Sequence, residues 1–209
     1  MDLEIAIRIV PANRVGEDRA AAFTIPNGHL LVLADGAGGT SGGAAAADAV
    51  LDRASVSSPT CAADCVHVLE TVDRALAELG QTTAILLVVS AGRVFGASVG
   101  DSAAWLLDGS RTLDLTENQD RKPLLGSGRA EPVPFGPFDF RGRVLVGSDG
   151  LFKYVDVNRV RDIAANLPVG SVADALVAAA RLPSGGLQDD IAIIVAAQQA
   201  VEADGRASW

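Results

Sequence analysis

The chain has 209 residues, of which 49% are hydrophobic and 21% charged, and its formal net charge at pH 7 is −9. Because domains usually contain roughly 100–200 residues, the length predicts one domain, 1–200, followed by a short tail, 201–209. The composition excludes a disordered or collagen-like chain, and the negative charge argues against binding to a nucleic-acid backbone.

The first half of the chain predicts strands followed by two helices. Period-two alternation and short apolar runs between turn residues are typical of strands, which are expected at 3–9, 21–25 and 29–34. A glycine-rich turn, 36–43, leads into the alanine-rich run 44–54, which favours a helix because alanine is the best helix former. A second helix is expected over 62–79, where apolar residues recur at helical spacing.

The second half of the chain predicts more strands, two further helices and a last strand. The strands are expected at 82–90, 93–99, 103–107, 112–115, 143–147 and 191–197. The helices are expected over 158–167 and 172–182, and the Pro- and Gly-rich segment 117–140 is expected to be an irregular surface excursion. Because strands and helices occur in blocks and do not alternate, the sequence predicts an α+β fold in which helix pairs cover sheet faces.

The N-terminal sequence and the cysteines predict a cytoplasmic protein. Met1 is followed by Asp2 and Glu4, unlike a signal peptide, and no apolar run approaches the ~20 residues of a membrane span. Cys61 and Cys65 are too few for the disulfide framework of a small secreted domain. Since they lie four residues apart in a helical segment, we expect free, buried thiols on one helix face.

Carboxylates recur where apolar strands end. Asp35, Asp101 and Asp149 each follow such a strand, and Asp189 and Asp190 precede one. An unpaired buried carboxylate is disfavoured, and few basic residues flank these positions. Because hard divalent cations prefer oxygen ligands, the pattern predicts a metal site, although Asp-Gly pairs are also ordinary turn signals.

Two other chemistries fit the sequence poorly. The glycine-rich turn lacks the Gly-Lys-Ser/Thr ending of a nucleotide-binding loop, so its glycines are expected to bring the Gly36 carbonyl close to a cation. Neither His29 nor His67 lies in a nucleophile-elbow context, and the segment around Ser148 is not Gly-x-Ser-x-Gly. A serine hydrolase is therefore not expected.

Seven short motifs follow one another along the chain. They are Gly16-Glu17-Asp18-Arg19, Leu33-Ala34-Asp35-Gly36-Ala37-Gly38-Gly39, Gln81-Thr82-Thr83-Ala84, Val99-Gly100-Asp101-Ser102, Leu115-Thr116-Glu117-Asn118, Gly147-Ser148-Asp149-Gly150-Leu151 and Asp189-Asp190-Ile191-Ala192-Ile193-Ile194-Val195. From about residue 3 to residue 197, this order resembles the metal-dependent serine/threonine protein phosphatases, the type 2C or PPM family, in their compact bacterial form. The resemblance implies a four-layer α-β-β-α sandwich with two central antiparallel sheets flanked by helix pairs.

The resemblance also implies a centre of two Mn²⁺ or Mg²⁺ ions at one edge of the sheets. Asp35 would bridge both ions, and the Gly36 carbonyl would bind one of them. Asp149 and Asp189 would complete the other site. Asp190 replaces a common Asn, which leaves open whether it or Asp189 is the ligand.

Water and a third ion complete the implied centre. Glu17 and Asp18 would hold metal-bound waters, and Asp101 would help to bind a third, weaker ion. A hydroxide bridging the two main ions would attack phosphorus in line and expel the serine or threonine alkoxide. No covalent phospho-enzyme is expected.

Several positions depart from the family pattern. Ala37 stands where several members have a histidine general acid, so the leaving group would take its proton from water. The position of the phosphate-clamping arginine is Asn13, and Arg14, one residue later, is the expected phosphate contact. Lys153 replaces a frequent acidic residue and would weaken the third metal site or stand in for that ion. The flap, about 119–129, is short, which predicts an open substrate groove.

The sequence therefore predicts an enzyme that hydrolyses phosphoserine and phosphothreonine in proteins. Its expected partners are a phosphoprotein substrate and a Ser/Thr kinase or the targets of that kinase; neither nucleic acid nor a membrane is expected. The alternative, motivated by Ala37, Asn13 and Lys153, is a pseudophosphatase or regulatory module that binds phosphoproteins with little turnover. A non-protein phosphomonoester is a third interpretation of the substrate.

Overall fold

A computed structural model describes residues 2–37, 42–77, 79–109 and 111–199. The expected tail, 201–209, and the middle of the glycine-rich turn, 38–41, lie outside the described residues. Across the described part of the chain, no helix combines the length and apolar character needed to cross a membrane.

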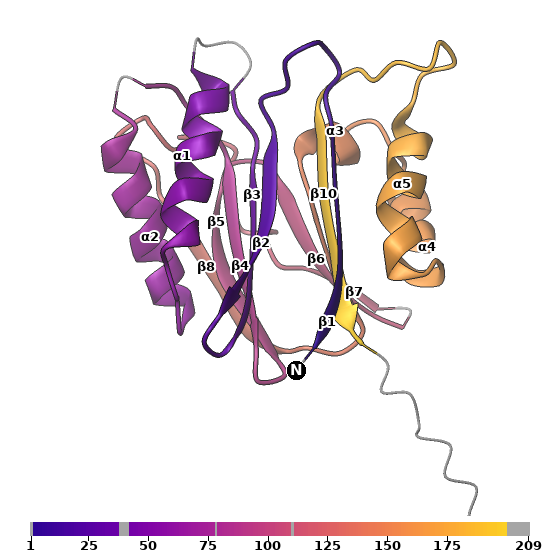
Figure 1. Cartoon of the computed structure of the whole chain (residues 1–209), viewed down its shortest axis with the longest axis horizontal. Coiled ribbons are helices and arrows are strands. Elements are labelled where there is room, and N and C mark those ends of the chain that lie inside the picture. Colours follow the sequence, from indigo (N-terminus) through magenta and orange to yellow (C-terminus); the bar gives the residue numbers. More distant parts are fainter. Residues whose placement is uncertain (1, 38–41, 78, 110, 200–209) are drawn as a thin grey trace, which may run out of the picture.

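Two antiparallel sheets lie face to face at the centre of the molecule (Figure 1). The first consists, in spatial order, of β1 (Leu3–Val10), β10 (Ile191–Gln198), β9 (Arg143–Gly147), β6 (Ala103–Asp108) and β7 (Arg111–Asp114). The second consists of β2 (Arg19–Ile25), β3 (Gly28–Ala34), β4 (Ala84–Ser90), β5 (Arg93–Val99) and β8 (Val133–Asp139).

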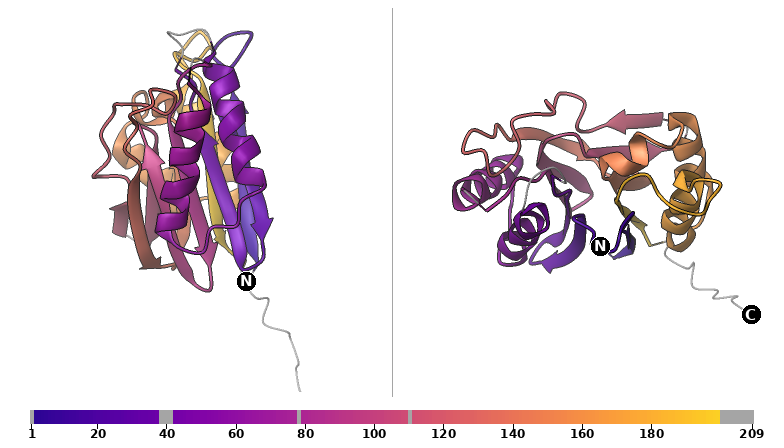
Figure 2. Two further views of the ribbon diagram at one scale, coloured as in Figure 1. Left: turned by 90° about the vertical axis from the view of Figure 1, so that its left-hand side faces the viewer. Right: turned by 90° about the horizontal axis from the view of Figure 1, so that it is seen from above.

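A helix pair covers the outer face of each sheet, and the view from above in Figure 2 shows the pairs on opposite sides. The helices over the second sheet are α1 (Gly43–Ser55) and α2 (Ala62–Ala75). Those over the first sheet are α4 (Val157–Asn166) and α5 (Val169–Ala180), together with the single turn α3 (Asp149–Phe152). The expected α-β-β-α sandwich is confirmed.

Side chains alternate between the two faces of a strand, so one sheet contributes to two hydrophobic cores. In β3, Leu30 and Val32 pack toward α1 and α2, whereas Leu31 and Leu33 pack between the two sheets. Because alternate side chains point to opposite faces and both faces of the central strands are covered, β3, β4 and β10 are almost uninterrupted apolar runs. The result is a firmly packed stack whose strand ends carry the loops.

The strand β8 corrects the expectation that 117–140 is irregular throughout. It was missed because Pro134, Gly136 and Pro137 interrupt its apolar pattern. Prolines are tolerated on edge strands, where one side makes no ladder hydrogen bonds, and among the described strands β8 pairs only with β5. A register shift between Val94 and Gly96 of β5 accommodates the irregularity.

Smaller differences concern helix ends and one cysteine. The helix expected over 62–79 ends at Ala75, the helix expected over 172–182 runs from Val169 to Ala180, and α3 was not expected. Both cysteines are free, but only Cys65 is buried, because Cys61 is the exposed N-cap residue of α2. The expectation that both thiols are buried on one helix face is therefore wrong.

Candidate functional site

The antiparallel topology brings the acidic loops to one edge of the sandwich. Where two strands run antiparallel, the end of one lies beside the start of the other. Thus Arg19 at the start of β2 is opposite Ala34 at the end of β3, and Ala84 at the start of β4 is opposite Val99 at the end of β5. The end of β9 lies beside the start of β10 in the same way. These ends lie at the upper edge in Figure 1.

A pocket of about 430 Å³ opens at this edge. Seven acidic side chains line it: Glu17, Asp18, Asp35, Asp101, Asp149, Asp189 and Asp190. Gly36 also lines it, so the structure brings together every residue that the sequence assigned to metal or its waters. Three basic side chains, Arg121, Lys122 and Lys153, join them, which leaves a formal charge of −4. Arg14, the expected phosphate contact, is exposed and does not line the pocket.

The Thr82-Thr83 segment, which directly precedes β4, holds the backbone of Asp35. The Asp35 N–H donates to Thr83 Oγ1 at 3.1 Å, and the Asp35 carbonyl accepts from Thr83 N at 2.8 Å and Thr82 Oγ1 at 2.9 Å. Thr83 Oγ1 also lies 2.8 Å from Ser102 Oγ, and all three hydroxyl-bearing residues are buried. The backbone of Asp35 is therefore positioned by the residues that directly precede β4.

Two glycines allow the acidic loops to approach one another. A Cβ at Gly150 would lie 2.0 Å from the Asp190 carbonyl oxygen, so only glycine lets the loop after Asp149 pack on the loop before β10. A Cβ at Gly36 would lie 2.6 Å from the Gly43 backbone and 2.9 Å from the Glu17 Cβ. The glycine of each of these Asp-Gly pairs thus allows the loops to pack closely.

The structure distinguishes Asp190 from Asp189. The Asp190 carboxylate accepts the Ala12 N–H at 2.8 Å and the Glu17 N–H at 2.6 Å, one on each oxygen. It therefore fixes the loop that carries Glu17 and Asp18. Among the described residues, the Asp189 carboxylate accepts only the adjacent Asp190 N–H, at 3.1 Å, which makes Asp189 the better placed of the two to bind a cation.

Two carboxyl groups of the pocket have strongly raised pKa values. Burial, followed by the charges of neighbouring carboxylates beginning with Asp18, raises the pKa of Asp35 to about 9. Burial also raises the pKa of Asp18 to about 7, although a hydrogen bond from Ser148 opposes the shift. Like charges gathered out of water disfavour the ionised form. The chain alone does not neutralise this group of acids.

Two ion pairs partly compensate the charge. Lys153 Nζ contacts Asp149 Oδ2 one turn along α3, and Arg121 Nε and Nη2 lie 2.8 and 2.6 Å from Asp101 Oδ2. Burial raises the pKa of Asp149, and Lys153 lowers it. Burial lowers the pKa of Lys153, but its hydrogen bond with Asp149 and the nearby acidic charges raise it overall.

The residues of the pocket fit a hard divalent cation in their chemistry. Asp18 Oδ2 is buried and has no hydrogen-bond partner among the described residues, an arrangement that a cation would relieve. The donors are oxygens, which Mg²⁺ and Mn²⁺ prefer. Within the described ranges no three His, Cys, Asp or Glu side chains are already gathered in ligating positions. Binding of a metal ion would therefore require the carboxylates to move closer together and the ion pairs of Asp149 and Asp101 to break.

Sequence reasoning missed the basic side chains Arg121 and Lys122 and the hydroxyl groups around Asp35. Arg121 and Lys122 lie in the irregular segment after β7, where no periodic pattern indicates which side chains turn inward. The number of acidic residues in the motifs was one signal that basic side chains lie nearby, because so many carboxylates at one edge require cations. Thr83 was quoted within a motif, but its role as a hydrogen-bond partner of Asp35 appears only in the tertiary structure.

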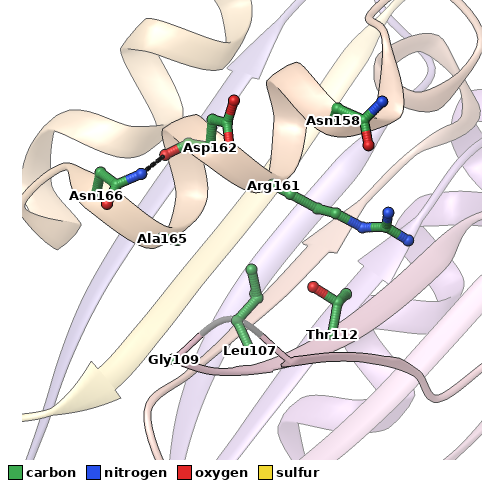
Figure 3. Close-up of a pocket in the computed structure, with 8 residues that line it drawn as sticks. All are labelled: Leu107, Gly109, Thr112, Asn158, Arg161, Asp162, Ala165 and Asn166. Atoms are coloured by element: carbon green, nitrogen blue, oxygen red, sulfur yellow. Dashed lines mark hydrogen bonds between the residues drawn. The ribbon is translucent and has the colours of Figure 1, made fainter.

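A second pocket, of about 390 Å³, lies between α4 and the hairpin of β6 and β7 (Figure 3). Its charged residues are Arg161 and Asp162, and the Arg161 guanidinium lies 5.6 Å from the ring centroid of Trp105. Figure 3 shows Arg161 and Asp162 pointing in different directions from α4. This pocket lacks a group of carboxylates, so it is not a candidate metal centre.

Solved structures share this fold. A bacterial serine phosphatase aligns with a TM-score of 0.82 and 20% identity, over 95% of this chain and 98% of its own. The serine/threonine phosphatase Stp1 from Staphylococcus aureus aligns with a TM-score of 0.82 and 21% identity, over 95% and 96%. The catalytic domain of the serine/threonine protein phosphatase PstP, in complex with two manganese ions, aligns with a TM-score of 0.80 and 22% identity, over 93% and 97%.

These likenesses confirm, at the level of the fold, the resemblance to bacterial serine/threonine phosphatases. No protein-family model matches the sequence, and no curated protein sequence matches it. The likeness to these solved structures is therefore a likeness of fold.

Proposed function

We propose that this protein is a metal-dependent phosphatase that hydrolyses phosphoserine and phosphothreonine in proteins. The observation that carries the proposal is the pocket itself: seven acidic and three basic side chains line it at one edge of the sandwich. Two divalent cations would neutralise its formal charge of −4. The manganese-bound PstP domain, which has the same fold, supports this choice of cofactor.

The ligands would be those that the sequence motifs indicate. Asp35 would bridge two Mn²⁺ or Mg²⁺ ions, with the Gly36 carbonyl on one side and Asp149 and Asp189 on the other. Bound divalent ions would supply positive charge that lowers the pKa of water and stabilises the phosphoryl group during its transfer. Because Lys153 contacts Asp149 in the metal-free chain, this ion pair would loosen when Asp149 binds metal.

Other residues of the chain would orient the site. Glu17 and Asp18 would hold water molecules beside the ions, and Asp190 would keep their loop in place through its two backbone contacts. Asp101, which lines the pocket and forms an ion pair with Arg121, would contribute to a third and weaker site. The methyl side chain of Ala37 cannot act as a general acid, so the departing alkoxide would be protonated by water.

The cellular setting follows from the proposed activity. A phosphoprotein substrate requires a Ser/Thr kinase, and we propose that the protein reverses the action of such a kinase on its targets. Both cysteines are free thiols, which is consistent with a reducing compartment such as the cytoplasm.

The decisive test is hydrolysis of p-nitrophenyl phosphate and of phosphothreonine peptides with added Mn²⁺, with excess chelator, and by the Asp149→Asn variant. We expect turnover that requires metal and falls by roughly a thousandfold in the variant, as for loss of a main electrostatic stabiliser. Asp162→Asn, the same change at the other pocket, is the matched control and should retain full activity. A folded, metal-loaded protein without turnover would instead support a pseudophosphatase.

A further inference from the structure

The proposed reaction brings a phosphate dianion to a pocket that is rich in carboxylates. A negatively charged group is attracted there only where positive charge faces it. Arg14, the cation expected from the sequence, does not line the pocket. The basic side chains that do line it are Arg121, Lys122 and Lys153, and two of these are anchored on pocket carboxylates.

Exposure shows on which side of the carboxylates these two cations lie. The Arg121 side chain is 72% exposed and its partner Asp101 is 21% exposed. The Lys153 side chain is 41% exposed and its partner Asp149 is 16% exposed. In both pairs the cation therefore lies on the solvent side of its carboxylate, at the mouth of the pocket.

The segment that carries Arg121 is held by buried contacts. Leu125 and Thr82 exchange backbone hydrogen bonds of 3.1 and 3.2 Å. Asp73 of α2, which is buried, accepts the N–H groups of Gly126, Gly128 and Ala130 at 2.7 to 3.1 Å. A cation on an anchored segment loses less conformational entropy when it binds a ligand.

The two side chains also have the right hydrogen-bonding capacity. Arg121 directs Nε and Nη2 to a single oxygen of Asp101, and its Nη1 makes no hydrogen bond in the described part of the chain. A guanidinium binds phosphate through parallel N–H groups, and an ammonium binds it as a compact charge. Lys122 lines the same pocket but is exposed and contacts no pocket carboxylate among the described residues.

We propose that Arg121 and Lys153, which both line the pocket, bind the phosphate group of the substrate and so perform the role that the sequence suggested for Arg14. The inference rests on the proposed phosphatase function. Arg121 belongs to the segment after β7 and Lys153 to the C-cap of α3, so two separate elements would clamp one phosphate.

The test measures inorganic phosphate binding to the Mn²⁺-loaded protein by calorimetry, together with its inhibition constant and the KM for p-nitrophenyl phosphate. Arg121→Gln and Lys153→Gln should each weaken phosphate binding and raise both constants by about tenfold, as for loss of a charged hydrogen bond. Arg121→Lys and Lys153→Arg should recover part of the loss. Arg14→Gln, and Arg161→Gln at the second pocket, should stay within about twofold of the original protein.

A Mn²⁺ titration of every variant separates phosphate binding from metal binding. The proposal is overturned if both glutamine variants bind phosphate as well as the original protein, or if extra Mn²⁺ fully restores their binding. A greater loss in Arg14→Gln than in Arg121→Gln would also overturn it. Calorimetry needs no turnover, so an original protein that binds phosphate through Arg121 and Lys153 without hydrolysis would refute the proposed function and leave this inference standing.

Discussion

The pocket at the sheet edge and the pocket beneath α4 are similar in size, about 430 and 390 Å³, yet they differ in charge and burial. At the sheet edge, seven carboxylates from five segments of the chain line one pocket, and two of them have strongly raised pKa values. Beneath α4, the charged residues are one arginine and one aspartate. Cavity size therefore does not identify the functional site. The site is identified by the uncompensated negative charge that the fold gathers there.

The largest expected difference between the pockets is in catalysis. Asp35→Asn removes the carboxylate that would bridge the ions, and we expect the metal-dependent rate to fall by more than roughly a thousandfold. Without metal, the same change should stabilise the fold by about 1–3 kcal/mol, because it removes a buried group repelled by its neighbours. Asp162→Asn should change neither quantity. Activity assays and denaturant unfolding in chelator measure both.

The two cysteines Cys61 and Cys65 test what burial alone does to the pKa of a side chain, away from the acidic pocket. Burial, with a smaller contribution from the charge of Asp64, raises the pKa of Cys65 to about 12. Because the raised pKa keeps this thiol protonated at pH 8 and the thiolate is the nucleophile, an aromatic disulfide reagent should label it at least about a hundredfold more slowly than the exposed Cys61.

The labelling has simple controls. Cys65→Ser should abolish the slow phase and Cys61→Ser the fast one, and denaturant should make both thiols react. Equal rates for the two thiols in the folded protein would contradict the burial of Cys65.

Metal binding should stabilise the protein through the acidic pocket alone. At about one hundred times its dissociation constant, Mn²⁺ should add about 2.7 kcal/mol to the free energy of unfolding. In a chain of this size that corresponds to a rise of about 5–10 °C in Tm. Excess chelator should reverse the rise, Asp149→Asn should reduce it, and Asp162→Asn should preserve it. A shift that persists in Asp35→Asn would place the metal elsewhere.

The smallest expected effect concerns positioning. Thr83→Val leaves the Asp35 N–H without its partner, and we expect a loss of about 1–2 kcal/mol in stability and of roughly tenfold in rate. Thr112→Val makes the same substitution at the pocket beneath α4 and should have little effect on rate. Equal rates in both variants would show that the contact from Thr83 does not position Asp35.

The acidic residues of the site could be predicted from the sequence, whereas the basic residue Arg121 and the strand β8 could not. The strand-end aspartates could be recognised in the sequence because each follows or precedes a clear apolar run. In the structure all of them line one pocket. Arg121 gave no such signal, since the segment around it has no periodicity. Pro134 and Pro137 concealed β8, because a proline in an edge strand and a proline in a loop look alike in sequence.

The sequence by itself determined the layered α+β architecture and the acids at its edge, because period-two and helical apolar patterns specify which faces are buried. Only the tertiary structure decided how the carboxylates differ. Asp189 and Asp190 both line the pocket, but among the described residues only Asp190 holds a distant loop through its carboxylate. Arg121 lines the pocket as well, whereas Arg14 does not. The physical reason is that hydrogen bonds and charge pairs between distant loops depend on the distances that folding creates, which no local pattern records.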